Sequence, residues 1–258
     1  MTPHEQVQAQ YGKQAGYYSV SVSHATSDTL QLMLELAQPK GSERVLDVAT
    51  GTGFCAMAFA PHVKEVVAYD LTPQMLAEAE RLATERGIGN MRFEQGPAEA
   101  MPFDDGSFEI VTARTGTHHF DSVPKFMAES MRVLTPGGQL LIADTSSPDD
   151  AEADAWEAEI EILRDPSHVR DYNMAEWKAF VHDAGFELIE ARQWNWTELT
   201  FRDWVLRSGT PPAAVEKLRE LFANAPASAV EAFQIQRQGA DDFVWTWPVV
   251  LLAARKPR

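Results

Sequence analysis

The chain has 258 residues, of which 45% are hydrophobic, and its formal net charge is −16 at pH 7. This length and apolar content are enough for one α/β domain with an appended lid. The negative charge would repel a phosphate backbone, which argues against nucleic acid as a partner. No apolar run approaches the roughly 20 residues of a membrane span and no secretory signal is evident, so a cytoplasmic location is expected.

Cys55 is the only cysteine of the chain. An intrachain disulfide and any multi-cysteine metal site are therefore excluded, and the sequence predicts no metal site of another kind. We expect Cys55 to be a small residue that packs a helix on a sheet.

Residues 1–23 are mostly polar and are interpreted as an N-terminal arm. Tyr11, Tyr17 and Tyr18 are its main apolar anchors. Because so few apolar side chains cannot hold an independent fold, we expect the arm to be mobile in the free protein and ordered over a bound ligand.

An apolar run that ends on a glycine-rich turn is the most informative feature of the chain. Val45–Val48 predict a buried strand, Gly51 and Gly53 let the backbone turn tightly beneath a ligand, and Phe54–Ala60 predict the following helix. A second apolar run, Val66–Asp70, ends on a carboxylate 19 residues after Gly51. That carboxylate can accept hydrogen bonds from both hydroxyl groups of a ribose, so the ligand is predicted to carry a ribose.

Helix and strand patterns alternate over the rest of the first 145 residues. Thr72 and Pro73 predict a helix start, with a capping hydroxyl before a proline at the first helical position. The other predicted elements are strands that begin at Met91 and Phe108, a helix from its cap Asp121 to Val133, and a strand over Gln139–Ala143. The alternation predicts a mostly parallel sheet with helices on both faces, with residues 24–145 as a nucleotide-binding core.

All seven tryptophans lie after residue 146. We expect most of them to bury added helices against the sheet, and one or two to line a cavity. Residues 146–180 are interpreted as a lid insert, and 146–258 as this insert with the C-terminal part of the core, all within one globular domain. An acidic segment is predicted to be a solvated helix face, and it comprises Asp149, Asp150, Glu152, Asp154, Glu157, Glu159 and Glu161.

Four segments resemble the successive motifs of one enzyme family: Val45–Gly53, Asp70–Thr72, Ala98–Phe103 and Arg132–Gly138. The family is the class I S-adenosylmethionine-dependent methyltransferases, in particular their UbiE-like branch. Two more segments, Arg114–Phe120 and Leu163–Arg170, resemble a bacterial sub-branch whose members mostly lack an assigned substrate. The resemblance implies a Rossmann-like α/β fold, with a seven-stranded, mostly parallel sheet whose last strand is antiparallel. It also implies a small helical lid made from the arm and the insert.

The resemblance implies a site for S-adenosylmethionine. Its residues would be Asp47 and the turn of Ala49, Gly51, Thr52 and Gly53 beneath the methionine part, Asp70 on the ribose hydroxyl groups, Leu71, Met75, Ala98 and Glu99 around the adenine, Arg114 at the amino group, and Tyr18 from the arm. At Ala98 and Arg114 the backbone would make the contact.

One position departs from the family pattern. Many relatives have an aspartate before the alanine at position 98, where it receives the adenine amino group, but this chain has Pro97. Proline offers neither a carboxylate nor an amide proton, so the contact is lost or taken over, and Glu99 is the candidate to replace it.

Three histidines are expected where the family builds its acceptor pocket: His118, His119 and His168. A general base is needed only if the acceptor is a hydroxyl or an activated carbon, and histidine suits that role. Each histidine could instead hold a turn or line the pocket. Arg164, Asp165 and Arg170 admit two interpretations, an internal salt bridge that fixes the lid or a site for an acidic acceptor.

The sequence therefore predicts methyl transfer from S-adenosylmethionine, with S-adenosylhomocysteine as product, to a small aromatic or apolar acceptor at carbon or oxygen. Gly51–Ala56 also fits the dinucleotide fingerprint of a nicotinamide-dependent oxidoreductase, but Asp47 beside the turn would repel a pyrophosphate. A third hypothesis is a non-catalytic protein that senses the cofactor by closing around it. The acceptor, its nucleophilic atom and the oligomeric state stay open.

Overall fold

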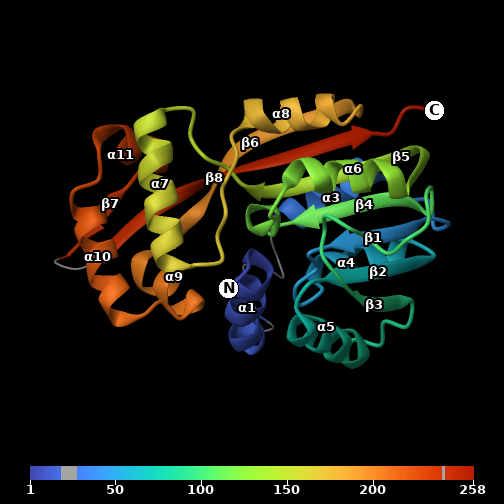
Figure 1. Cartoon of the computed structure of the whole chain (residues 1–258), viewed down its shortest axis with the longest axis horizontal. Coiled ribbons are helices and arrows are strands. Elements are labelled where there is room, and N and C mark those ends of the chain that lie inside the picture. The colour runs from blue at the N-terminus through green and yellow to red at the C-terminus, as the bar shows by residue number, and fades with distance from the viewer. Residues whose placement is uncertain (19–27, 240–241) are drawn as a thin grey trace.

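The computed structural model describes residues 1–18, 28–239 and 242–258, which form a mixed α/β structure (Figure 1). The strands are β1 (Arg44–Val48), β2 (Glu65–Asp70), β3 (Met91–Gln95), β4 (Phe108–Arg114), β5 (Leu134–Thr145), β6 (Glu187–Thr200), β7 (Gln236–Gln238) and β8 (Asp242–Arg255). The helices are α1 (Pro3–Tyr18), α3 (Asp28–Ala37), α4 (Phe54–Phe59), α5 (Pro73–Glu85), α6 (Val123–Val133), α7 (Ala151–Arg164), α8 (Met174–Asp183), α9 (Phe201–Ser208), α10 (Pro212–Ala223) and α11 (Ala227–Phe233), with short 3-10 helices η1 (Ala60–His62) and η2 (Thr117–His119).

The strands form one sheet in the order β3-β2-β1-β4-β5-β8-β6, and the short β7 pairs with β8. Strands β1 to β5 are parallel, whereas β8 runs antiparallel to both β5 and β6. The predicted Rossmann-like sheet with an antiparallel last strand is confirmed, and β7 is a strand that the sequence did not predict. Because β2 and β4 flank β1 on opposite sides, a crevice opens at the carboxyl end of β1.

Side chains of the central strands alternate between two hydrophobic clusters, one on each face of the sheet. On one face, Val45 packs with residues of α3 and α4, including Met33 and Cys55. On the other face, Leu46 packs with residues of α6 and α8, including Trp177. Cys55 is buried in this packing, as the sequence predicted.

Helices α7, α9, α10 and α11 form a side lobe around the ends of β6 and β8 that extend beyond the core (left in Figure 1). The interior of the lobe is aromatic: the rings of Trp204 and Trp245 meet edge to face, 5.2 Å apart, and Phe222 contacts both. The buried tryptophans of the chain are Trp156, Trp177, Trp204, Trp245 and Trp247, so the prediction that most tryptophans are core residues is confirmed. The lobe uses residues 201–233 as well as the predicted insert.

The N-terminal segment is a helix, α1, and lies between α5 and α9 (Figure 1). Its amide side chains attach it to both sides. Gln8 donates to the backbone oxygen of Leu71 at 2.9 Å, and Gln10 donates to that of Ser208 at 2.8 Å. The polar composition predicted an arm that orders over a bound ligand, and in the structure contacts with the core and the side lobe hold Pro3–Tyr18 as a helix.

The predicted cap Asp121 is wrong, whereas the helix start at Thr72 and Pro73 is confirmed without its capping hydrogen bond. Ser122, and not Asp121, caps α6, because its side chain accepts a hydrogen bond from the backbone nitrogen of Lys125. Thr72 is the residue before α5, but its hydroxyl makes no capping hydrogen bond. Each position was correct to within one residue, whereas the choice of capping group depends on side-chain orientation in the folded chain.

The acidic segment is not simply a solvated face, which contradicts the prediction. The side chain of Asp150 caps α7, and the same helix turns Glu157 and Glu161 into the interior. The side lobe and the segment that follows α7 both pack against this helix. The pattern of charges in the sequence does not contain these tertiary contacts, so it could not predict which acidic side chains are buried.

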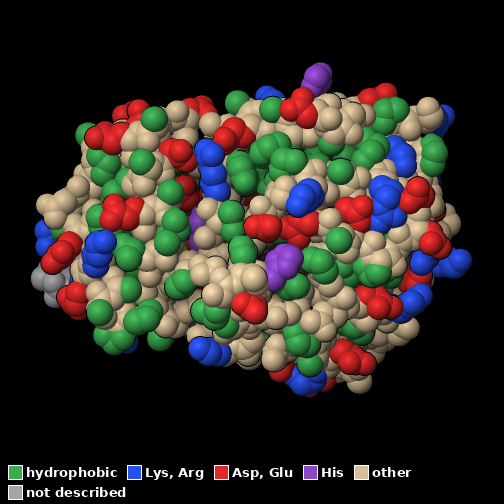
Figure 2. All heavy atoms as spheres, viewed as in Figure 1, with side chains coloured by type: hydrophobic (Ala, Val, Ile, Leu, Met, Phe, Trp, Pro, Cys, Tyr) green, Lys and Arg blue, Asp and Glu red, His purple; other side chains and the backbone are tan. Residues whose placement is uncertain are grey.

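Acidic and basic side chains are interspersed on the face shown in Figure 2. Among the described residues, no helix combines the length and the apolar character needed to cross a membrane.

Candidate active site

A cavity of about 280 Å³ lies at the carboxyl ends of β1, β2 and β4, beneath α1 and beside the side lobe. It has two connected parts. One part is formed by the glycine-rich turn and by the ends of β2 and β4. The other, which we call the histidine chamber, is lined by His118, His119, Thr145, Glu161, Arg164, His168, Asp171, Trp196, Leu199, Trp204, Arg207 and Trp247.

The turn after β1 depends on left-handed backbone conformations. Ala49, Gly51 and Gly53 have φ values of 53°, 54° and 83°. A Cβ atom at Gly53 would lie 2.9 Å from the Cβ of Ala79 in α5, so only glycine fits where α4 starts. This close packing brings the turn and α5 together at the rim of the cavity. Gly53 itself supports the turn from behind and does not line the cavity.

Asp47 holds the turn from below. Its carboxylate accepts hydrogen bonds from the hydroxyls of Thr50 at 2.5 Å and Thr112 at 2.6 Å, and from the backbone nitrogen of Ala56 at 3.1 Å. Burial raises the pKa of this carboxyl group. Asp47 therefore joins β1, β4 and α4, and its oxygens are already used within the protein.

Asp70 connects the end of β2 to the same turn. One oxygen accepts a hydrogen bond from the backbone nitrogen of Gly51 and the other from that of Thr72, both at 2.8 Å. Each carboxylate oxygen can accept more than one hydrogen bond, so both keep capacity for a ligand. Burial raises the pKa of Asp70 to about 6.

The structure brings most of the predicted cofactor residues to one cavity. Lining residues among them are Asp47, Ala49, Gly51, Thr52, Asp70, Leu71, Met75, Ala98, Glu99 and Arg114. The side chain of Tyr18 lies outside the described residues. Near the position that lacks the family aspartate, Glu99 accepts a hydrogen bond from the backbone of Ser122 and lies 3.5 Å from the ring of His4.

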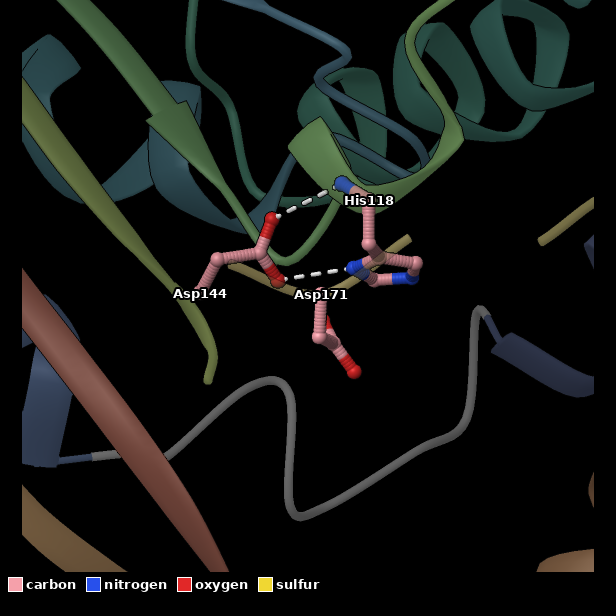
Figure 3. A group of neighbouring side chains, drawn as sticks. All are labelled: His118, Asp144 and Asp171. Atoms are coloured by element: carbon pink, nitrogen blue, oxygen red, sulfur yellow. Dashed lines mark hydrogen bonds and ion pairs between the residues drawn. The ribbon is translucent and has the colours of Figure 1, made fainter. Parts of the chain in front are cut away.

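His118 is held by Asp144 at the end of β5. Figure 3 shows the Asp144 carboxylate turned toward both the backbone nitrogen and the ring of His118, and the ring Nδ1 lies 2.8 Å from Asp144. Burial opposes protonation of His118, but the negative charge of Asp144 outweighs it and raises the pKa of the histidine to about 9. His118 is therefore an imidazolium at neutral pH, which makes it a poor base.

His119 has the opposite character. Its Nδ1 lies 3.0 Å from the backbone oxygen of Ser167, which can only accept, so Nδ1 carries the proton. Its Nε2 then accepts a hydrogen bond from the hydroxyl of Tyr11 in α1, at 2.6 Å. Burial and the charge of His118 lower the pKa of His119 to about 3. A neutral imidazole with its lone pair directed at Tyr11 thus lies in the chamber.

His168 is the third member of the group. Its ring stacks on that of His118 with centroids 5.4 Å apart, and its Nδ1 lies 4.0 Å from a carboxylate oxygen of Glu161. Glu161 in turn pairs with Arg164 at 2.8 Å. The three predicted histidines are therefore neighbours in the fold, although His168 lies 49 positions after His119 in the sequence.

Arg164, Asp165 and Arg170 all have partners within the protein. Arg164 pairs with Glu161, and the carboxylate of Asp165 accepts hydrogen bonds from the backbone and hydroxyl of Ser167. Arg170 pairs with Glu176 at 3.0 Å. These contacts favour the interpretation in which this segment fixes the lid.

Sequence reasoning missed several residues of the chamber. Tyr11 was identified only as an apolar anchor, and Arg207, Asp171 and Glu161 were not assigned to the site. The sequence around these residues gives no local signal of a site, since α1, α7 and α9 reach the chamber only through tertiary packing.

The fold and the crevice at β1 define the class of protein. A family model described as a methyltransferase domain matches residues 46–142. Together with the relatives below, this match shows that the chain belongs to the class I S-adenosylmethionine-dependent methyltransferases.

The chain is 35% identical over 225 residues to the uncharacterised methyltransferase YcgJ of Bacillus subtilis, which covers 87% of this chain and 88% of that protein. The crystal structure of YcgJ matches with a TM-score of 0.86, covering 90% of this chain and 100% of that chain. Escherichia coli YafE, an uncharacterised protein, is 34% identical over 76% of this chain and 93% of that protein.

A demethylmenaquinone methyltransferase of Thermus thermophilus is 41% identical over 117 residues, covering 45% of this chain and 53% of that protein. The predicted resemblance to the UbiE-like branch is thereby confirmed. The family assignment favours the methyltransferase hypothesis over the oxidoreductase hypothesis.

Proposed function

We propose that the protein transfers a methyl group from S-adenosylmethionine to a small acceptor bound in the histidine chamber, at a carbon or an oxygen atom. The observation that carries the proposal is the continuous cavity that joins the Asp70 crevice to three histidines. When bound, S-adenosylmethionine supplies a methyl group activated by its sulfonium. The residues present fit such a ligand: the Asp70 carboxylate can accept further hydrogen bonds, and it lines the cavity beside the glycine turn.

The cofactor contacts that we propose are those implied by the family resemblance, at residues that line the crevice. Asp70 would accept hydrogen bonds from the ribose hydroxyl groups, and the backbone at Ala98 and Arg114 would contact the adenine and the amino group. Leu71 and Met75 would flank the adenine. We assign Asp47 a positioning role, because its oxygens already hold the turn.

The chamber supports an acceptor with an apolar ring and a polar group. Trp196, Trp204 and Trp247 contribute aromatic surface, whereas Arg164 and Arg207 bring charge. An aromatic acceptor that carries a hydroxyl or carbonyl group fits this mixture of aromatic and polar surface better than a hydrocarbon.

We assign the role of proton acceptor to His119, with Tyr11 as its intermediary, on geometry: Nε2 of His119 accepts a hydrogen bond from the Tyr11 hydroxyl at 2.6 Å. The lowered pKa of His119 keeps it unprotonated at neutral pH but makes it a weak base. As the acceptor oxygen or carbon attacks the methyl carbon, its proton passes to the Tyr11 oxygen while the Tyr11 proton passes to Nε2 of His119. Bound S-adenosylmethionine would supply the methyl group and would keep the electron pair of the broken bond on its sulfur, leaving as S-adenosylhomocysteine. His118, paired with Asp144, keeps a positive charge beside the developing negative charge of the acceptor.

Calorimetry tests the cofactor part of the proposal. We expect heat of binding for S-adenosylmethionine and S-adenosylhomocysteine at micromolar concentrations, and none for NAD or NADP. The reverse result would contradict the proposal. Binding of the methionine cofactor without turnover of any hydroxylated aromatic acceptor would favour the cofactor-sensing hypothesis.

A further inference from the structure

Glu157 of α7 meets two side chains of the following segment in the wall of the histidine chamber. A carboxylate oxygen of Glu157, one of Asp171 and a ring nitrogen of His168 all lie within 4.8 Å of one another. These groups are removed from solvent: Glu157 is 1% exposed, Asp171 is 2% exposed and the side chain of His168 is 2% exposed.

The hydrogen bonds of this group are only partly satisfied by the surrounding protein. Asp171 accepts a hydrogen bond from the hydroxyl of Thr145 at 2.6 Å. Among the described residues, however, Oε1 of Glu157 and Nε2 of His168 have no hydrogen-bond partner. Two buried carboxylates repel each other unless a proton or a cation lies between them. A shared proton would leave His168 without a partner, whereas a cation can bind all three groups.

A second cluster can be compared with this one. His118, Asp144 and Asp171 also lie within 4.8 Å of one another (Figure 3). Asp144 is already saturated, because it accepts hydrogen bonds from the backbone of Thr117 and Thr145 as well as from His118. Its oxygens therefore have little remaining capacity for a cation, which leaves Glu157, His168 and Asp171 as the better ligand set.

We propose that Glu157, His168 and Asp171 bind one divalent cation, of the Mn²⁺ or Zn²⁺ type, in the wall of the histidine chamber. One imidazole and two carboxylates form a ligand set that suits such intermediate cations. Bonds of about 2.0–2.2 Å separate the ligand atoms of one ion by roughly 3–4 Å, so only small side-chain shifts are needed.

The cation would face the chamber. His168 and Asp171 line the cavity and Glu157 does not, so Glu157 holds the ion from behind and the remaining coordination positions point toward the open space. There the ion would bind an oxygen of the acceptor. That role rests on the proposed function, whereas the binding of the ion does not.

Titration of chelator-treated protein with MnCl₂, and separately with ZnCl₂, tests the site by calorimetry and, for manganese, by electron paramagnetic resonance. We expect one ion per chain, with affinity reduced at least about 10-fold in Glu157→Gln, since the loss even of a supporting group costs this much. Glu159→Gln is the matched control: this residue lies in the same helix with its side chain 48% exposed, and its variant should bind normally.

A manganese soak of crystals gives an answer that does not depend on the folding of a variant. An anomalous scattering peak between the three side chains would support the proposal. Absence of ion binding by the wild-type protein, or equal binding by both variants, would overturn it. A higher melting temperature of Glu157→Gln in a protein that binds no ion would identify a shared proton instead. If the wild-type protein binds the ion but transfers no methyl group to any acceptor, that result would count against the proposed function and not against the ion site.

Discussion

At the scale of single residues, Asp70 connects the glycine turn to the predicted ribose site. Asp70→Ala should weaken binding of S-adenosylmethionine by about 1.5–3 kcal/mol, the range for hydrogen bonds to a charged group. The exposed Asp104→Ala serves as a control and should bind normally. Unchanged affinity of the Asp70 variant in calorimetry would mean that the ribose is bound elsewhere.

The pKa of Asp70 gives this binding a pH dependence. Only the ionised carboxylate accepts hydrogen bonds from both ribose hydroxyls, and burial raises the pKa of Asp70 to about 6. The ionised fraction falls as pH decreases through this value, so affinity should be about 10-fold weaker at pH 5 than at pH 7. Asp70→Asn should remove most of this difference. A wild-type affinity that is the same at both values would show that Asp70 does not titrate in this range.

Variants of Tyr11 and His119 test the proposed transfer of the acceptor's proton. Tyr11→Phe keeps the ring that packs edge-on against His119 at 4.9 Å but removes the hydroxyl. With an acceptor identified, turnover should fall by about 100-fold or more in Tyr11→Phe and in His119→Ala, the usual contribution of a positioned base. Affinity for the cofactor should be retained. His182→Ala, at an exposed position, should behave as wild type.

Near-normal turnover in variants of all three chamber histidines would contradict a general base. The reaction would then depend on alignment of an acceptor that is already nucleophilic.

At the scale of elements, α1 is the part of the fold most suited to close the cavity. It carries Tyr11 and is held by polar contacts to Leu71 and Ser208, and Ala15 is a buried apolar residue in it. A helix held by so few apolar contacts opens at low free-energy cost. Hydrogen exchange of the amides of Pro3–Tyr18 should therefore slow when the cofactor binds. Equal exchange rates with and without cofactor would show that α1 is not a lid.

At the scale of the whole molecule, β6 and β8 join the core to the side lobe. Because both strands run through the two parts, we expect them to unfold as one cooperative unit. Phe222→Ala removes a ring that packs against Trp156, Phe201 and Trp204, and should cost about 3–5 kcal/mol. Urea denaturation should show a single transition at a lower midpoint. Two separate transitions would indicate that the side lobe is an independent domain.

The nucleotide-binding half could be predicted from the sequence because its signals are local. The apolar run of Val45–Val48, the glycines that need a left-handed backbone and the acidic end of β2 are set by neighbouring residues and by general rules of parallel sheets. These features were sufficient to infer the fold class and to propose Asp70 as the ribose site. The same segments also carry the resemblance to the class I S-adenosylmethionine-dependent methyltransferases.

The histidine chamber was decided by tertiary structure. No local pattern shows that α1 would be helical, that α7 would bury Glu157 and Glu161, or that α9 would bring Arg207 to the cavity. The opposite protonation of His118 and His119 likewise depends on Asp144, Ser167 and Tyr11, which come from distant parts of the chain. Strand and turn preferences act over a few residues, whereas burial and pairing of charges depend on which elements pack together, so only the folded chain fixes the chemistry of this chamber.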